Sequence, residues 1–317
     1  MELKEIVRKS QDFLDLKNEV EKNSLSKSIL LFSKDNLYSF EFAKLIAGLI
    51  LNNGGDEENE NLLKILVLSH PDVKIYPIKD KLMVSDSEEI VIESYIKPIF
   101  SDKKIFIIRD IDNSTESAQN KLLKILEEPP ENVYFILTCA SENLVLPTIK
   151  SRCNKIELKK IQSEFIEKMF ASSENAKLVA QISDGLVGKG IALSKMRNLR
   201  ELFQDVLSIF TKMKSSKQVL GFSNKILGYK GQFNLVIEIM SLLLEDMLLL
   251  KAGSENIHFF DCKGELTSIL NEYTVKAIIE IQKEINKSCK ELFYNTNLNV
   301  VFENLLLNIL EDKYLCR

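Results

Sequence analysis

The sequence lacks the features of a disulfide-stabilised, zinc-binding or membrane-spanning protein. Its five cysteines are an odd number, and the nearest pair, Cys139 and Cys153, is 14 positions apart. That is neither a disulfide framework nor a zinc spacing. The most apolar stretch, residues 239–250, contains Glu245 and Asp246 and is too short to cross a bilayer. The N-terminus also lacks the apolar core of a signal peptide, so we expect a cytoplasmic protein with free thiols and no membrane partner.

An excess of positive charge is also missing. Lys and Arg number 42 against 46 Asp and Glu, which gives a formal net charge of −4. A nucleic-acid-binding protein that acts alone usually carries a strongly basic domain, so the composition argues against one. It does not exclude a subunit of a DNA-tracking assembly in which other members carry the positive charge. The 317 residues, 45% of them hydrophobic, suffice for two or three domains.

The first half of the chain alternates strand and helix patterns. Four apolar runs predict buried strands: residues 28–32, 65–68, 105–108 and 133–137. Residues 37–51 and 115–128 have apolar positions at helical spacing, and Pro129-Pro130 ends the second of these helices. Residues 52–61 read as a solvated loop. Apolar strands separated by helices favour a parallel sheet covered on both faces.

The second half is helical. Three short helices are expected at 163–170, 175–183 and 189–199, and the pattern stays helical from about residue 200 onward. Residues 235–250 are apolar nearly all round, which indicates a helix buried inside a bundle or an interface. The prediction is an α/β domain, a small helical domain and a helical C-terminal domain.

The first strand–helix junction, residues 33–40, is where a parallel-sheet protein would hold a phosphate. A P-loop needs glycines, a lysine for the β- and γ-phosphates and a Ser or Thr for magnesium. No glycine occurs between Ser33 and position 47. Counted back from the helix, Ser39 stands in the lysine position and Phe40 in the magnesium position, where we expect it to pack in the core. We therefore predict no tight nucleotide binding and no cofactor.

The third predicted strand ends in an altered acidic motif. A hydrolytic nucleotide site places a metal-holding Asp first and a carboxylate base after it, but here Arg109 precedes Asp110. A cation repels magnesium. Asp110 without its partner metal is expected to be a solvated or capping carboxylate, so a second position indicates that ATP chemistry is missing.

The segment from 114 to 153 carries the most specific pattern. It contains NKLLKILEEPP at 120–130, a strand that includes Thr138, and IKSRC at 149–153. Together with HPD at 70–72, this resembles the clamp-loader branch of the AAA+ proteins. In that family a helix with this motif precedes a strand bearing the sensor-1 threonine, and a Ser-Arg-Cys motif supplies an arginine finger.

The resemblance implies a fold and a division into domains. It predicts an AAA+-like domain with a degenerate nucleotide site over 1–162, a helical lid over 163–205 and a helical collar that joins subunits over 206–317. Active relatives have a sensor-2 arginine where this chain has Gly188. A loop between two short helices would explain that segment equally well, and HPD would otherwise be a turn with a structural His70.

The resemblance also implies a function, that of a non-hydrolysing subunit of the DNA polymerase III clamp loader. Arg152, flanked by Ser151 and Cys153, would enter the nucleotide pocket of a neighbouring gamma/tau subunit. The delta subunit would be a further partner, and the sliding clamp and primer-template DNA would be reached through the assembly. An active gamma/tau-like ATPase and a helical nucleic-acid-binding protein acting alone are the alternative functions.

Simpler interpretations of these side chains stay open. Arg152 could merely pair with a local carboxylate such as Glu157. Thr138 could be a strand-end hydroxyl with a structural partner. The lysines around Arg152 could favour a neighbour's nucleotide or be ordinary solvated side chains: Lys150, Lys155, Lys159 and Lys160. Many relatives carry a four-cysteine zinc module, but residues 48–69 contain no cysteine, so we predict no metal.

Overall fold

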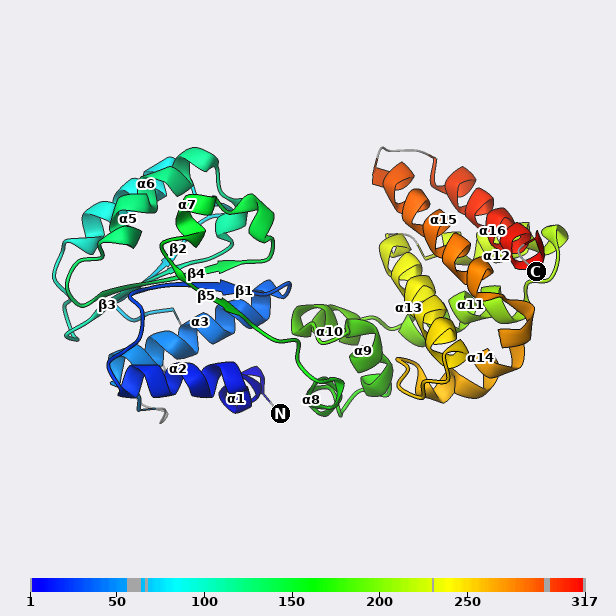
Figure 1. Cartoon of the computed structure of the whole chain (residues 1–317), viewed down its shortest axis with the longest axis horizontal. Coiled ribbons are helices and arrows are strands. Elements are labelled where there is room, and N and C mark those ends of the chain that lie inside the picture. Colours follow the sequence, from blue (N-terminus) through cyan, green and yellow to red (C-terminus); the bar gives the residue numbers. More distant parts are fainter. Residues whose placement is uncertain (1, 56–63, 66–67, 230, 294–296, 316–317) are drawn as a thin grey trace. The chain divides into compact units, whose positions relative to one another are not determined.

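The computed structural model describes residues 2–55, 64–65, 68–229, 231–293 and 297–315 (Figure 1). Two compact units make up the chain. Unit 1 comprises Met1–Ala171 and Ser183–Ile191, and unit 2 comprises Ser172–Ile182 and Ala192–Arg317. The boundaries expected from the sequence, 162 and 205, remain a prediction.

A five-stranded parallel sheet forms the centre of unit 1. Its strands are β1 (Ser28–Phe32), β2 (Val73–Tyr76), β3 (Lys104–Ile108), β4 (Val133–Cys139) and β5 (Asn154–Glu157). They lie in the order β2-β3-β4-β1-β5, and every neighbouring pair is parallel. This confirms the predicted parallel-sheet domain, and three of the predicted apolar runs are the three inner strands.

The predicted strand at 65–68 is wrong. Ile65 lies in a helical turn, Leu68 is 58% exposed with a φ of 58°, and residues 66–67 lie outside the described part of the chain. The second strand is instead β2, which begins at Val73. Residues 56–61 of the predicted solvated loop also lie outside the described residues.

Helices cover both faces of the sheet (Figure 1). One face carries α1 (Leu3–Lys9), α2 (Gln11–Glu21) and α3 (Asn36–Leu51), and the other carries α5 (Val84–Ser94), α6 (Glu116–Glu127) and α7 (Pro147–Lys150). Phe106 and Phe135 from the sheet stack at 5.3 Å between ring centroids in the core beneath α6. Unit 1 also contains α8 (Ser163–Met169) and the beginning of α10 (Val187–Ser194). The helix expected at 189–199 thus ends at Ser194.

Unit 2 is helical. It holds most of α9 (Ala176–Ser183), then α11 (Leu199–Lys212), α12 (Ser216–Leu227), α13 (Phe233–Lys251), α14 (Lys263–Ile269), α15 (Val275–Phe293) and α16 (Leu298–Leu315). Short 3-10 helices occur at Ile111–Asn113, Glu142–Leu144, Phe260–Cys262 and Leu270–Glu272. Helix α13 packs against α11 and α15 and buries Ile239, Leu243 and Met247. The apolar run at 235–250 is therefore largely the core of this unit. No helix in the described ranges is long and apolar enough to cross a membrane.

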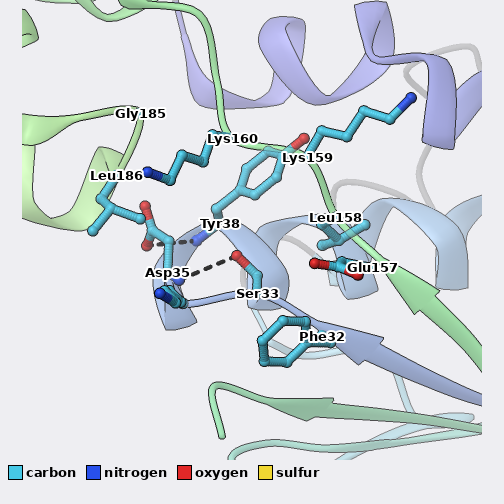
Figure 2. A pocket seen from close by; sticks show the side chains of 11 residues that line it. Phe32, Ser33, Asp35, Tyr38, Glu157, Leu158, Lys159, Lys160, Gly185 and Leu186 are labelled. Carbon is cyan, nitrogen blue, oxygen red and sulfur yellow. Dashed lines mark hydrogen bonds between the residues drawn. The ribbon is translucent and has the colours of Figure 1, made fainter. Parts of the chain in front are cut away.

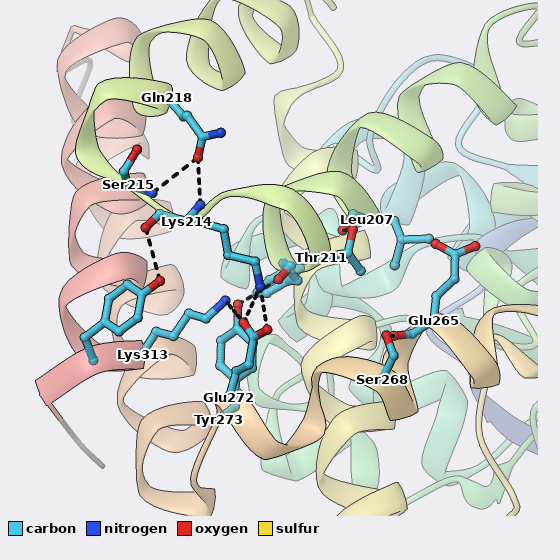
Figure 3. A network of polar contacts seen from close by, with 12 residues as sticks. Leu207, Thr211, Lys214, Ser215, Gln218, Glu265, Ser268, Glu272, Tyr273 and Lys313 are labelled. Atoms are coloured by element: carbon cyan, nitrogen blue, oxygen red, sulfur yellow. Dashed lines mark hydrogen bonds and ion pairs between the residues drawn. The ribbon is translucent and has the colours of Figure 1, made fainter.

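A polar cluster joins the end of α16 to the rest of unit 2 (Figure 3). The side chain of Lys313 is 1% exposed, and its Nζ lies 2.6 Å from Glu272 Oε2. The same ammonium lies 4.5 Å from the centroid of the Tyr273 ring, and Lys214 also pairs with Glu272. The buried lysine thus has both a carboxylate and an aromatic face as partners.

Candidate functional site

The junction between β1 and α3 is closed by Asp35. Its carboxylate accepts hydrogen bonds from the backbone N–H groups of Leu37 and Tyr38, each 3.1 Å from Oδ1. The N–H of Asp35 in turn donates to Ser33 Oγ at 3.1 Å (Figure 2). This is an N-cap, in which a side-chain oxygen satisfies donors at the start of a helix. The first N–H groups of α3, which a phosphate would need, therefore already have an anionic partner.

The same carboxylate also binds the beginning of α10. Its Oδ2 accepts the N–H of Gly188 at 3.0 Å, and Asp35 is only 6% exposed. A Cβ at position 188 would lie 3.0 Å from Oδ1 and 3.5 Å from Leu37 Cβ, so a larger residue would fit only if the Asp35 carboxylate moved by a few tenths of an ångström. Two helix N-termini thus converge on one internal carboxylate. Helix N-termini favour anions, and here the chain supplies its own.

Phe40 and Arg109, which the sequence analysis assigned to degenerate motifs, contact each other. The Arg109 guanidinium lies 4.8 Å from the centroid of the Phe40 ring, and Lys44 Nζ lies 5.1 Å from the same centroid. Phe40 is half-buried and serves as a platform for cations, which corrects the expectation of simple core packing. Arg109 Nη2 also donates to Pro77 O at 3.4 Å. Ser39 is fully buried and donates to Asn36 O at 3.2 Å.

Asp110 and Thr138 are linked at the ends of β3 and β4. Asp110 has a φ of 50°, and its N–H donates to Thr138 Oγ1 at 3.1 Å. Burial raises the pKa of Asp110, the nearby Asp112 raises it further and Arg109 opposes both. Asp112, whose role was not predicted, accepts the N–H groups of Ala140 and Ser141 at 3.2 and 2.8 Å. The carboxylate of Asp112 is thus committed to local structure, whereas Asp110 makes no side-chain cap hydrogen bond and contributes the backbone partner of Thr138.

A cavity of 490 Å³ lies beside Asp35 (Figure 2). Tyr38, Lys159 and Lys160 line it, and they also line an adjoining cavity of 230 Å³. Burial is the main cause that raises the pKa of Tyr38 to about 12, so its hydroxyl is neutral at physiological pH. Lys160 forms an ion pair with Asp184. The cavity retains room for a small molecule, but the helix ends that would hold its phosphates are occupied.

The HPD segment is structural. The carboxylate of Asp72 is fully buried and accepts the N–H groups of Ile99, Phe100 and Ser101 at 2.5, 2.7 and 2.8 Å. His70 Nδ1 accepts the N–H of Asp72 at 3.1 Å, and burial lowers the pKa of His70. The segment therefore fixes the loop at 99–101, and His70 is held neutral as a hydrogen-bond acceptor.

Arg152 lies at the surface of unit 1, just after α7. Its Nε and Nη2 both lie 2.8 Å from Glu127 Oε2, and its Nη1 donates to Thr148 O at 3.1 Å. The interpretation that Arg152 pairs with a local carboxylate agrees with this contact, but the carboxylate is that of Glu127 at the end of α6 and not that of Glu157. Its motif neighbours differ: the exposed Ser151 donates to Thr148 O at 3.1 Å, and Cys153 is buried in the core beside the sheet.

Three of the four lysines near Arg152 have partners. Lys150 Nζ donates to Glu142 O at 3.0 Å, and Lys155 Nζ lies 2.7 Å from Glu142 Oε1. Lys160 pairs with Asp184, as above. Lys155 and Lys160 thus pair with carboxylates and Lys150 with a backbone carbonyl, which supports the interpretation of ordinary surface side chains.

Comparison with known proteins finds similarity to subunits of DNA polymerase III. A family model described as DNA polymerase III, delta subunit, matches residues 9–162. The delta' subunit of Bacillus subtilis DNA polymerase III is 25% identical over 93% of this chain and 94% of its own length. The gamma subunit of Buchnera aphidicola is 26% identical over 72% of each chain. A gamma subunit-related protein from Thermotoga maritima covers 96% of this chain at 19% identity, with a TM-score of 0.49.

The parallel-sheet domain followed by helical regions that the sequence predicted is confirmed. The sequence did not reveal that Asp35 caps α3 and binds Gly188, or that Glu127 binds Arg152. The N-cap of α3 could have been found, because Asp precedes the helix with Leu37 and Tyr38 in its first turn.

Proposed function

We propose that this chain is a delta-prime-type clamp-loader subunit that hydrolyses no ATP and supplies Arg152 to the nucleotide pocket of a neighbouring gamma/tau subunit. One observation carries the proposal. The carboxylate of Asp35 occupies the N–H groups of α3 that a phosphate would need and also binds Gly188, while Arg152 stays at the surface with a side chain that is 29% exposed. The alignment with a delta' subunit over 93% of the chain supports it.

The chemistry of an arginine finger fits Arg152. Phosphoryl transfer develops charge on the γ-phosphate oxygens, and a guanidinium held against them stabilises that charge. Arginine is always protonated, and its planar fork matches phosphate oxygens. Of the five N–H groups of Arg152, three contact Glu127 and Thr148, which leaves two for a phosphate of the neighbour.

The proposal extends to partners and location. The chain would assemble in the cytoplasm with gamma/tau and delta subunits, with unit 2 as the collar that joins them. It would act on the sliding clamp and primer-template DNA through that assembly. The net charge of −4 is consistent with DNA contacts supplied by other subunits.

Nucleotide binding is the first test. Calorimetric titration of the purified chain with Mg-ATP should show no binding up to about millimolar concentration, because a triphosphate would compete with a covalently tethered carboxylate. Micromolar affinity would contradict the proposal and favour the alternative of an active gamma/tau-like ATPase.

Arg152→Ala is the second test. In a loader reconstituted with its partner subunits, this variant should lower DNA-stimulated ATPase turnover at the adjoining site by up to about 10³-fold. Arg200→Ala, which removes an exposed arginine from unit 2, is the matched control and should leave turnover unchanged. If Arg152→Ala assembles normally and turnover does not fall, Arg152 is not the finger.

A further inference from the structure

Glu127 occupies an unusual place for a glutamate. It is the last residue of α6, where the unpaired carbonyl groups and the negative end of the helix dipole disfavour a carboxylate. Its Oε2 lies 2.8 Å from both Nε and Nη2 of Arg152. The arginine offsets this unfavourable position, and the carboxylate in turn holds the guanidinium.

The geometry holds the guanidinium from one side. Glu127 engages the edge formed by Nε and Nη2, and Thr148 O accepts from Nη1 at 3.1 Å. The backbone that carries Arg152 is itself fixed, because the next residue, Cys153, is buried in the core and the Arg152 N–H donates to Ile149 O at 3.0 Å. A long, flexible side chain is thereby held in one orientation with two N–H groups still available.

We propose that Glu127 is a positioning residue for the arginine finger. The inference rests on the proposed function and adds the group that orients Arg152 before a neighbour's nucleotide arrives. The two remaining N–H groups can meet a phosphate without breaking the ion pair, so Glu127 acts by positioning rather than by inhibition. Fixing an arginine in advance removes part of the rotamer entropy that binding would otherwise cost.

The ion pair between Arg152 and Glu127 is open to solvent, and this limits its contribution to folding stability. The side chains of Arg152 and Glu127 are 29% and 57% exposed, and exposed ion pairs contribute little to stability. We therefore expect Glu127→Ala to fold normally and to lower kcat of the reconstituted loader by about fivefold. KM for ATP should stay unchanged, because the triphosphate is bound by the neighbouring subunit.

Two further variants isolate the role of Glu127. Glu128→Ala removes an equal charge from the next residue and should leave kcat unchanged, so it controls for a general electrostatic effect. Glu127→Gln keeps a side-chain oxygen that can accept from Arg152 and should restore part of the loss. Both variants, and Glu127→Ala, should unfold at the same temperature as the parent chain.

The double variant separates this inference from the proposed function. If Glu127 acts through Arg152, Glu127→Ala should have no further effect in an Arg152→Ala background. A strong effect of Arg152→Ala with none of Glu127→Ala overturns the positioning role alone. A rise in kcat for Glu127→Ala, or equal losses for Glu127→Ala and Glu128→Ala, also overturns it. No effect of Arg152→Ala overturns both.

Discussion

Asp35 is expected to hold the beginnings of two helices in unit 1, and its removal tests the description of the site directly. In Asp35→Ala, the N–H groups of Leu37, Tyr38 and Gly188 lose an acceptor that lies 3.0–3.1 Å away. Loss of one N-cap costs about 1 kcal/mol. Because one carboxylate caps α3 and also binds Gly188 near the start of α10, we expect unit 1 to lose about 2 kcal/mol of stability.

Two measurements give the size of the stability loss in Asp35→Ala and its location in the chain. Urea unfolding followed by far-ultraviolet circular dichroism gives the change in stability, since the chain has no tryptophan to report it by fluorescence. Hydrogen exchange at the amides of Tyr38 and Gly188 should quicken about 30-fold, the factor that corresponds to 2 kcal/mol. Unit 2 amides far from this site should exchange as before.

Asp35→Asn is the matched control. Asparagine is as good an N-cap as aspartate, so Oδ1 should still accept from Leu37 and Tyr38. Its amide nitrogen cannot accept from Gly188, and the expected loss is about 1 kcal/mol. Sulfate should stabilise Asp35→Ala more than the parent chain, because the two vacated helix ends favour an anion. An Asp35→Ala variant within about 0.5 kcal/mol of the parent chain would refute the double-capping argument.

Three further outcomes follow from buried groups. Burial would raise the pKa of Asp72, but the hydrogen bonds that its carboxylate accepts lower it below the ordinary 3.8. The stability that these bonds contribute should be present above pH 3.8 and should be lost as the pH falls through the lower pKa of the folded state. Acid titrations followed by circular dichroism should show this dependence in the parent chain and not in Asp72→Asn. Glu272→Gln should destabilise unit 2 by about 3 kcal/mol in urea unfolding, because Lys313 is 1% exposed and would lose its carboxylate partner; a loss under about 1 kcal/mol would contradict this. Burial raises the pKa of the Cys153 thiol to about 12, so in mass-spectrometric mapping at pH 8 it should be alkylated far more slowly than the exposed Cys289.

The inner and outer strands explain what the sequence could predict of the fold. β1, β3 and β4 lie inside the sheet and are continuous apolar runs, so periodicity identified them. β2 and β5 are the edges, and the sequences VKIY and NKIE are short and half polar because an edge strand needs less burial. The run at 65–68 is apolar in sequence but is not a buried strand, because Leu68 is exposed. Its apolar residues therefore predicted a strand that the structure does not contain there.

The candidate site was predictable only where its signal is local. The absence of glycine between Ser33 and position 47 and the cation at position 109 are visible in the sequence, and from them we predict that nucleotide chemistry is missing. The bond from Gly188 to Asp35 spans 153 residues, and the pair between Arg152 and Glu127 spans 25. Such pairings depend on how strands and helices meet in space, which no pattern of residue types records.

The residues at the predicted degenerate motifs form two pairs in the structure. The Asp35 carboxylate accepts the N–H of Gly188, and the Arg109 guanidinium lies over the ring of Phe40. Under the proposed function, the carboxylate serves helix N–H groups that a phosphate would need, and the guanidinium places a cation where a metal ion would lie. A lysine at position 39 and a magnesium-binding hydroxyl at position 40, introduced alone, would therefore leave the Asp35 carboxylate on the N–H groups of α3. They would also remove the aromatic partner of Arg109. Recovery of ATP binding should require the substitution of Asp35 as well, because an intramolecular anion competes with every triphosphate at a fixed and high effective concentration.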